Sequence, residues 1–171
     1  MLLGALFSAF ICIFSVITIP VGTIPFTLST FAVMLCALVL GQKMSMLSVL
    51  IYIFAGAIGI PVFSGFRAGI GVLIGPTGGY IWSYMLMSLV IGFFTKKKGS
   101  IFKNFAVCMF GLLVCYIFGT IQFMLIQKID VMSAIIICIL PFLAADALKA
   151  IAAAYIAERM NVILKKSQKN T

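Results

Sequence analysis

Long apolar runs alternate along this chain with short stretches rich in glycine, proline or lysine. We interpret five of these runs as membrane-spanning helices, because each approaches the roughly 20 apolar residues that cross a bilayer as a helix. These runs cover about residues 2–18, 27–41, 44–59, 79–95 and 104–127. The stretches between them, among them TIPVGTIPF (18–26) and the glycine- and proline-rich segment 59–80, are expected to interrupt the helices.

A sixth apolar run extends from residue 131 to residue 163. As one helix it would be about 50 Å long, whereas the hydrocarbon core of a bilayer is about 30 Å thick. Pro141 lies inside this run, and a proline in a helix interior kinks or breaks the helix. We therefore expect a short external or re-entrant helix over 131–140 and a last span that begins near Pro141.

Composition supports a membrane protein. The 171 residues are 64% hydrophobic and 9% charged, whereas soluble domains are roughly half apolar and a quarter charged. Six spans with short connections use nearly the whole length, which leaves no room for a separate soluble domain. The predicted fold is an all-α integral membrane protein with six transmembrane helices, in a single transmembrane domain over residues 1–171.

Basic residues are unequally divided between the two sides that this topology defines. Both termini and the loops after the second and fourth spans share one side, which carries Lys43, Lys96, Lys97, Lys98, Lys103, Arg159, Lys165, Lys166 and Lys169. The other side carries only Arg67 and Lys128, so the positive-inside rule predicts a multi-pass cell-membrane protein with both termini in the cytoplasm. The lysine run 96–98 lacks interleaved aromatic residues and lies between two spans, which argues against a nucleic-acid partner.

Asp146 and Lys149 are the first candidates for a functional site. They lie in an otherwise apolar segment, where a charge costs roughly 2.5 to 3.5 kcal/mol on insertion and usually faces protein or a water-filled cavity. Three residues apart, they share one face of a helix and can offer a ligand a carboxylate acceptor and an ammonium donor. The break at Pro141 puts both in the first two turns of the last helix, near the outer surface. The alternative is a structural ion pair that holds two helices together.

The second candidate is the loop IGVLIGPTGGY (70–80), which leads into the fourth span. Its glycines allow tight turns and close approach of the backbone to a ligand. The candidate binding residues here are Gly75, Pro76, Thr77, Gly78, Gly79 and Tyr80. A glycine-packed helix start, with Tyr80 and Trp82 in an interfacial aromatic belt, explains the same residues equally well. Arg67 is either a rim charge or a contact for the anionic end of a small amphipathic solute.

Motifs that the sequence lacks exclude several kinds of chemistry. It has no histidine, no Cys-x-x-Cys pair, no Gly-x-x-x-x-Gly-Lys phosphate loop and no Gly-x-Ser-x-Gly elbow. We expect no metal, no cofactor and no ATPase or serine-hydrolase activity, and we interpret the five cysteines as reduced, buried small hydrophobes. Two hypotheses from other classes remain: an intramembrane enzyme with Asp146 as its base, which lacks a second convergent acid or base, and a structural subunit that binds nothing.

Four motifs resemble the biotin-specific substrate-binding subunits of energy-coupling-factor transporters, the BioY family. They are IPVGTIPFTL (19–28), YIFAGAIGIPVFSGF (52–66), GVLIGPTGGY (71–80) and LPFLAADALKA (140–150), in the family's order and spacing. The resemblance implies the six-helix S-component fold and high-affinity capture of biotin from outside. It also implies delivery through a transmembrane coupling protein, the T component, and two cytoplasmic ATPase subunits. The alternatives are another small vitamin as the ligand, or a solitary biotin transporter without an ATPase module.

The resemblance also assigns roles to residues. It makes Asp146 and Lys149 the pair expected to hydrogen-bond the ureido ring of biotin, which offers two N–H donors and one carbonyl acceptor. It implies that the 75–80 loop, Phe63 and Thr27 belong to the same pocket.

The resemblance also bears on three of the first 30 residues, Ser29, Ala5 and Ala9. Ser29 departs from the family's pattern, which usually has glutamine there, so a contact made by that glutamine is not expected. Ala5 and Ala9 match the small-xxx-small pair expected to contact the coupling protein, since small residues four apart let another membrane helix approach closely. The alternative is packing within the subunit itself.

Overall fold

The computed structural model describes residues 2–21, 24–95 and 100–169. Its long helices are α1 (Leu2–Val16), α2 (Ser29–Leu40), α3 (Gln42–Ala57), α5 (Gly78–Phe94), α6 (Ile101–Gln127) and α8 (Leu140–Lys169). The short elements are β1 (Thr18–Val21), β2 (Ile24–Thr27), the 3-10 helix η1 (Ser64–Phe66), α4 (Ile70–Ile74) and α7 (Val131–Cys138). Each of the six apolar runs interpreted as a span therefore contains one long helix.

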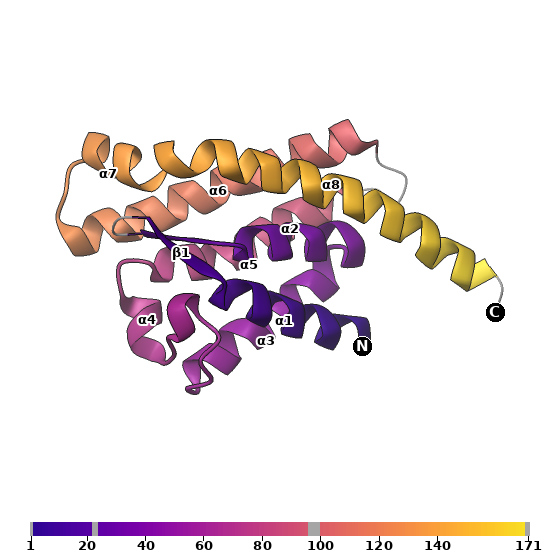
Figure 1. Cartoon of the computed structure of the whole chain (residues 1–171), viewed down its shortest axis with the longest axis horizontal. Helices are drawn as coiled ribbons and strands as arrows, with labels where there is room; N and C mark the ends of the chain where they lie inside the picture. The colour runs from indigo at the N-terminus through magenta and orange to yellow at the C-terminus, as the bar shows by residue number, and fades with distance from the viewer. Residues whose placement is uncertain (1, 22–23, 96–99, 170–171) are drawn as a thin grey trace.

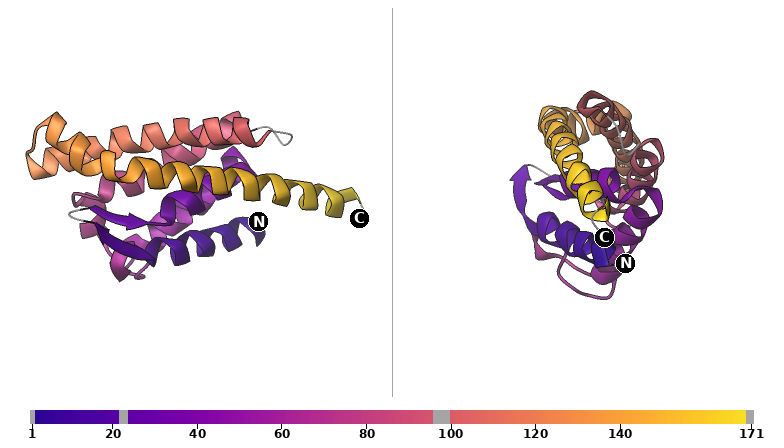
Figure 2. Two further views of the ribbon diagram at one scale, coloured as in Figure 1. Left: turned by 45° about the horizontal axis from the view of Figure 1, so that its top comes forward. Right: turned by 90° about the vertical axis from the view of Figure 1, so that its right-hand side faces the viewer.

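The six long helices lie roughly along one axis of the molecule (Figure 1). The two termini lie at one end, here called the termini end, together with the α2–α3 connection. The strands, α4 and α7 lie at the opposite end, here called the hairpin end (Figure 1). The left view of Figure 2 shows that α8 extends beyond the other helices at the termini end. This arrangement follows the alternation of direction that the sequence predicts.

The division of basic residues follows these two ends. Lys43 and Lys103 lie in the first turns of α3 and α6, which begin at the termini end, whereas Arg67 and Lys128 lie at the hairpin end. Lys96, Lys97 and Lys98 lie outside the described residues, as do the side chains of Lys165, Lys166 and Lys169.

Two of the six long helices are long and apolar enough to cross a bilayer by the usual measures of length and hydropathy. They are α6 and the Leu140–Ile163 part of α8. The other four apolar helices, α1, α2, α3 and α5, contain 15, 12, 16 and 17 residues. A 12-residue helix is only about 18 Å long, so the second apolar run forms a shorter helix than the predicted span over 27–41.

The interruption predicted over 18–26 is an antiparallel β-hairpin, which the apolar pattern alone did not indicate. Thr18 pairs with Thr27 and Pro20 pairs with Pro25. Prolines cannot donate a backbone hydrogen bond and are therefore confined to edge strands. A two-stranded ribbon consists only of edge strands, so it accommodates both.

The last apolar run breaks at Ile139, two residues before the predicted position. α7 ends at Cys138 and α8 begins at Leu140, so Pro141 lies in the first turn of α8. Proline is tolerated there because the first backbone N–H groups of a helix have no partner within it. Asp146 and Lys149 are the seventh and tenth residues of α8 and lie in its second and third turns, rather than in the first two turns as predicted.

Helices α5 and α6 pack closely because glycines face the contact. A Cβ at Gly79 would lie 2.6 Å from Cβ of Gln122 and 3.0 Å from the backbone oxygen of Phe118. A Cβ at Gly119 would overlap the ring of Tyr80. These contacts fix the start of α5, and with it the position of Tyr80, against α6.

Candidate functional site

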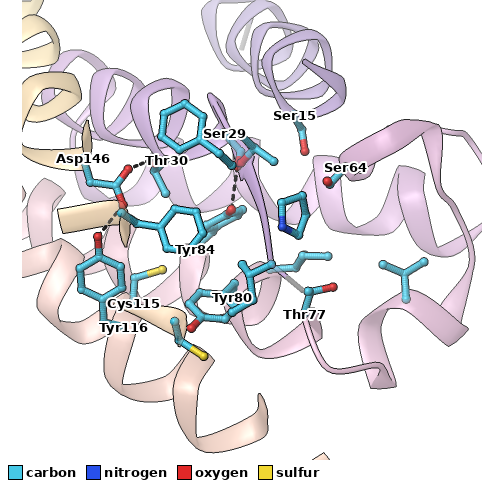
Figure 3. Close-up of a pocket in the computed structure, with 18 of the residues that line it drawn as sticks. Ser15, Ser29, Thr30, Ser64, Thr77, Tyr80, Tyr84, Cys115, Tyr116 and Asp146 are labelled. Carbon is cyan, nitrogen blue, oxygen red and sulfur yellow. Dashed lines mark hydrogen bonds between the residues drawn. The ribbon is translucent and has the colours of Figure 1, made fainter. Parts of the chain in front are cut away.

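A cavity of about 80 Å³ lies between the helices towards the hairpin end (Figure 3). Every described helix and β2 contribute residues to its wall, together with the two loops that follow η1 and α4. Its wall includes four tyrosines, Tyr52, Tyr80, Tyr84 and Tyr116, and six serine or threonine side chains, Ser15, Thr27, Ser29, Thr30, Ser64 and Thr77. The apolar part of the wall includes Ile24, Phe26, Val72 and Phe142. The site therefore suits a small ligand with both apolar and polar groups.

Six of the residues predicted to bind a ligand line this cavity. They are Asp146, Lys149, Tyr80, Thr77, Arg67 and Thr27. They come from β2, α5, α8 and the two loops that follow η1 and α4. The fold thus brings together segments that are more than 100 residues apart in the chain.

The other five predicted residues, Gly75, Pro76, Gly78, Gly79 and Phe63, do not line the cavity. A Cβ at Gly78 would overlap the backbone oxygen of Leu73, and Gly79 faces α6. These two glycines therefore serve close packing, which is the alternative that the sequence left open. Phe63 is fully buried, packs edge-on against Tyr52 at 5.5 Å between ring centroids, and leaves no room for a side chain at Gly56.

Asp146 and Lys149 form a buried ion pair on the cavity wall. Nζ of Lys149 donates to Oδ1 of Asp146 at 2.8 Å, and the two residues are 8% and 4% exposed, respectively. The hydroxyl of Thr30 donates to the same Oδ1 at 3.2 Å, and the hydroxyl of Tyr116 donates to Oδ2 at 2.5 Å. The carboxylate therefore accepts three hydrogen bonds from three different helices, α8, α2 and α6.

Lys149 also connects α8 to the β-hairpin. Its Nζ donates to the backbone oxygen of Thr27 at 2.6 Å and to the hydroxyl of Thr30 at 3.2 Å. The same Nζ lies 3.7 Å from the centroid of the Phe26 ring, within the range of a cation–π interaction. The ion pair thus holds the end of β2 against the cavity.

The hydrogen-bonding capacity of the pair is nearly filled within the protein. An ammonium has three donors, and Lys149 uses three. A carboxylate has about four acceptor positions, and Asp146 uses three, two at Oδ1 and one at Oδ2. Among the described residues only Tyr116 donates to Oδ2, so this oxygen has a position open to an N–H or O–H donor of a ligand.

Several hydroxyl groups of the cavity wall were not predicted as site residues, among them those of Ser15, Ser29, Tyr52 and Tyr84. Ser29 pairs with Tyr84 at 2.7 Å and with Thr27 at 2.5 Å. Ser15 pairs with Tyr52 at 2.6 Å. A tyrosine or serine in an apolar run is a weak signal, because such residues also serve helix packing. Ser29, noted earlier only as a departure from a family pattern, therefore contributes a polar group at this wall.

Ala5 and Ala9 do not line the cavity and lie on the exposed side of α1. The buried side of that helix is formed by other residues, among them Phe7, Ser8 and Ile11. The side chains of the two alanines are therefore exposed in the described part of the subunit, and their contact with a coupling protein stays a prediction.

The cysteines and acidic residues do not form a metal centre in the described part of the chain. No group of three or more His, Cys, Asp or Glu side chains there is close enough to hold an ion. All five cysteines are free thiols, four of them buried and Cys12 half-buried.

Comparisons of the sequence with protein families and with individual proteins point to the same family. The model of the BioY family matches residues 1–166. The chain is 40% identical over 157 residues to "Biotin transporter BioY" of Thermotoga maritima, covering 92% of each chain. It is 40% identical over 158 residues to "Probable biotin transporter BioY" of Pyrococcus horikoshii, covering 92% of this chain and 93% of that one.

A solved structure shares the fold. It is the S-component for biotin from an ECF-type ABC transporter, with a TM-score of 0.86 and 29% sequence identity. The match covers 92% of this chain and 87% of that structure. The helical architecture described above is therefore that of an S-component.

Proposed function

The chain belongs to the BioY family, and on that premise we propose that it takes up biotin as the substrate-binding subunit of an energy-coupling-factor transporter. The observation that carries the proposal is the buried Asp146–Lys149 pair on the wall of a cavity that also contains apolar and hydroxyl groups. The relatives named as biotin transporters support the choice of ligand. The protein transports its ligand and does not transform it.

Biotin complements the hydrogen-bonding groups of the pair. One ureido N–H donates to the open position on Oδ2 of Asp146. The ureido carbonyl accepts from Lys149 in place of the Thr30 hydroxyl, which is a long contact of 3.2 Å that costs little to exchange. Both proposed contacts with the ureido ring involve a charged group of the pair, and hydrogen bonds to charged groups are the stronger class.

We further propose that six helices, α1, α2, α3, α5, α6 and α8, cross the cell membrane with both termini in the cytoplasm. The shorter helices are completed across the bilayer by the hairpin and by the loops at the hairpin end, which faces outward. The excess of basic residues at the termini end supports this orientation.

A labelling experiment tests the orientation. Cysteine introduced at Gly65 should react with a membrane-impermeant thiol reagent added to intact cells, whereas cysteine introduced at Lys103 should not. Labelling at Lys103 from outside would invert the proposed topology.

The proposed partners are a transmembrane coupling protein, the T component, and two ATPase subunits. The sequence has no Gly-x-x-x-x-Gly-Lys phosphate loop, so ATP-driven uptake would take its energy from subunits other than this chain. The exposed side chains of Ala5 and Ala9 fit a contact with a helix of the coupling protein, because small residues let helix backbones approach closely.

Calorimetric titration of the purified protein with biotin and with a panel of other vitamins tests the function. We expect tight binding of biotin alone and at least about tenfold weaker binding in Asp146→Asn, because loss of one partner of a desolvated charge pair costs about 2 to 5 kcal/mol. Preference for another vitamin would replace biotin as the ligand. Uptake by cells that lack the ATPase subunits would indicate a solitary transporter.

A further inference from the structure

Ser15 and Tyr52 form a buried hydroxyl pair on the cavity wall, contributed by α1 and α3. Their side-chain oxygens lie 2.6 Å apart, and the residues are 2% and 1% exposed. Nothing in the charged pair or its hydrogen bonds involves either residue. Their position in the cavity therefore requires a separate explanation.

The pair has one more hydroxyl proton than its own hydrogen bond uses. Each hydroxyl has one proton to donate, and a hydrogen bond between the two uses only one of them. Among the described residues, neither hydroxyl has another hydrogen-bond partner. One O–H donor of the pair is thus left for a group inside the cavity, and a buried donor without an acceptor is costly.

The pair lies away from the carboxylate of Asp146. In Figure 3, Ser15 and Ser64 lie on one side of the cavity, and Asp146 and Tyr116 lie on the other. Arg67 also lines the cavity and donates from Nε to the backbone oxygen of Ser64 at 3.1 Å, which places its guanidinium near the Ser64 side. This side therefore combines a cation with an unused hydroxyl donor.

We propose that Ser15 and Tyr52 act together as one shared donor that binds the carboxylate of the ligand. This inference rests on the proposed function and adds a specificity determinant to it. Biotin has its ureido ring at one end and its carboxylate at the other. With the ureido ring at Asp146 and Lys149, the acid end extends away from the Asp146 carboxylate, towards the free O–H and Arg67.

A shared donor has a distinctive mutational pattern. In Tyr52→Phe, the hydroxyl of Ser15 keeps its proton and can still donate it to the ligand; in Ser15→Ala, Tyr52 can do the same. Each single variant should therefore lose less than about threefold in biotin affinity. The double variant has neither donor and should lose about tenfold or more, as expected for one hydrogen bond to a charged group.

Biotin methyl ester identifies the part of the ligand that is bound. Wild-type protein should prefer biotin to the ester, because the ester offers only a neutral acceptor. The double variant should lose most of that preference. Ser48→Ala is a matched control, because it removes a buried serine hydroxyl of α3 that does not line the cavity, and it should bind both ligands as the wild type does.

Isothermal titration of the wild type, both single variants, the double variant and the control separates the outcomes. A full loss in either single variant, with no further loss in the double variant, would show that the hydrogen bond between the two residues matters only structurally and would overturn the proposal. Equal weakening of biotin and its methyl ester would also overturn it. Failure of the wild type to bind biotin would refute the proposed function itself.

Discussion

Replacing Lys149 by methionine, alone and together with Asp146→Asn, distinguishes the contribution of the ion pair to protein stability from its contribution to biotin binding. The substitution keeps an unbranched apolar side chain but removes three hydrogen bonds and the contact with Phe26. Asp146, only 4% exposed, is left as a buried charge with two neutral donors, Thr30 and Tyr116. Breaking a buried pair in this way typically destabilises a protein by about 3 to 5 kcal/mol. We expect a loss of that size, together with the loss of biotin binding.

In the double variant Asp146→Asn with Lys149→Met, we expect protein stability and biotin binding to respond differently. Removing both charges removes the uncompensated carboxylate, and replacement of buried ion pairs by neutral groups is often neutral for stability. Most of the lost stability should therefore return. Biotin binding should not, because neither the carboxylate acceptor nor the ammonium donor for the ureido ring is restored.

Thermal unfolding in detergent and calorimetric titration with biotin measure the two properties on the same samples. A double variant that regains biotin affinity along with stability would show that the pair only holds the fold. A single variant as stable as the wild type would show that Asp146 is not held as a charge in this environment. Either result would refute the reasoning.

Three further predictions concern other parts of the molecule. Replacing both Ala5 and Ala9 by tryptophan should abolish ATP-dependent uptake but leave biotin binding intact, because both side chains are exposed; joint loss of binding and stability would contradict this. Gly79→Leu should lower the melting temperature markedly, since even a Cβ there lies 2.6 Å from a side chain of α6; unchanged melting would show that α5 and α6 can separate without cost. Hydrogen bonds from Ser133 lower the pKa of Asp130. The stability that Asp130 gives to α7 by capping it is therefore fully present above the usual carboxyl pKa of about 4, and it is lost as the pH falls through the lower pKa of the folded protein. Hydrogen exchange of α7 should show this pH dependence in the wild type and not in Asp130→Asn, which keeps a good N-cap.

The helices could be predicted because apolar runs and their breaks determine where a chain can cross a bilayer. The hairpin could not, because Pro20 and Pro25 are signals against strands and only the pairing of two short edge strands makes them compatible. The position of the last break was missed by two residues for a related reason. Pro141 is acceptable in the first turn of α8, so the break precedes it.

The site was predictable where it depends on charge and not where it depends on packing. Asp146 and Lys149 are conspicuous because charges are rare in apolar runs. Tyr116 and Tyr52 carry no such signal, and their convergence on the cavity follows from contacts between distant helices. Gly78 was placed in the pocket although it serves packing, since glycine permits both close helix contact and close ligand contact.

The length of α8 means that a small tilt of this helix moves its far end by several ångströms. This helix continues without a break from the cavity, at Lys149, to Ile163 and beyond, towards the termini end. The stretch from Lys149 to Ile163 spans roughly 20 Å at 1.5 Å per residue, so a tilt of about 10° around the ion pair displaces its far part by roughly 4 Å. A small change of tilt at the cavity therefore causes a larger displacement at the termini end, where the proposed partner would contact the helix.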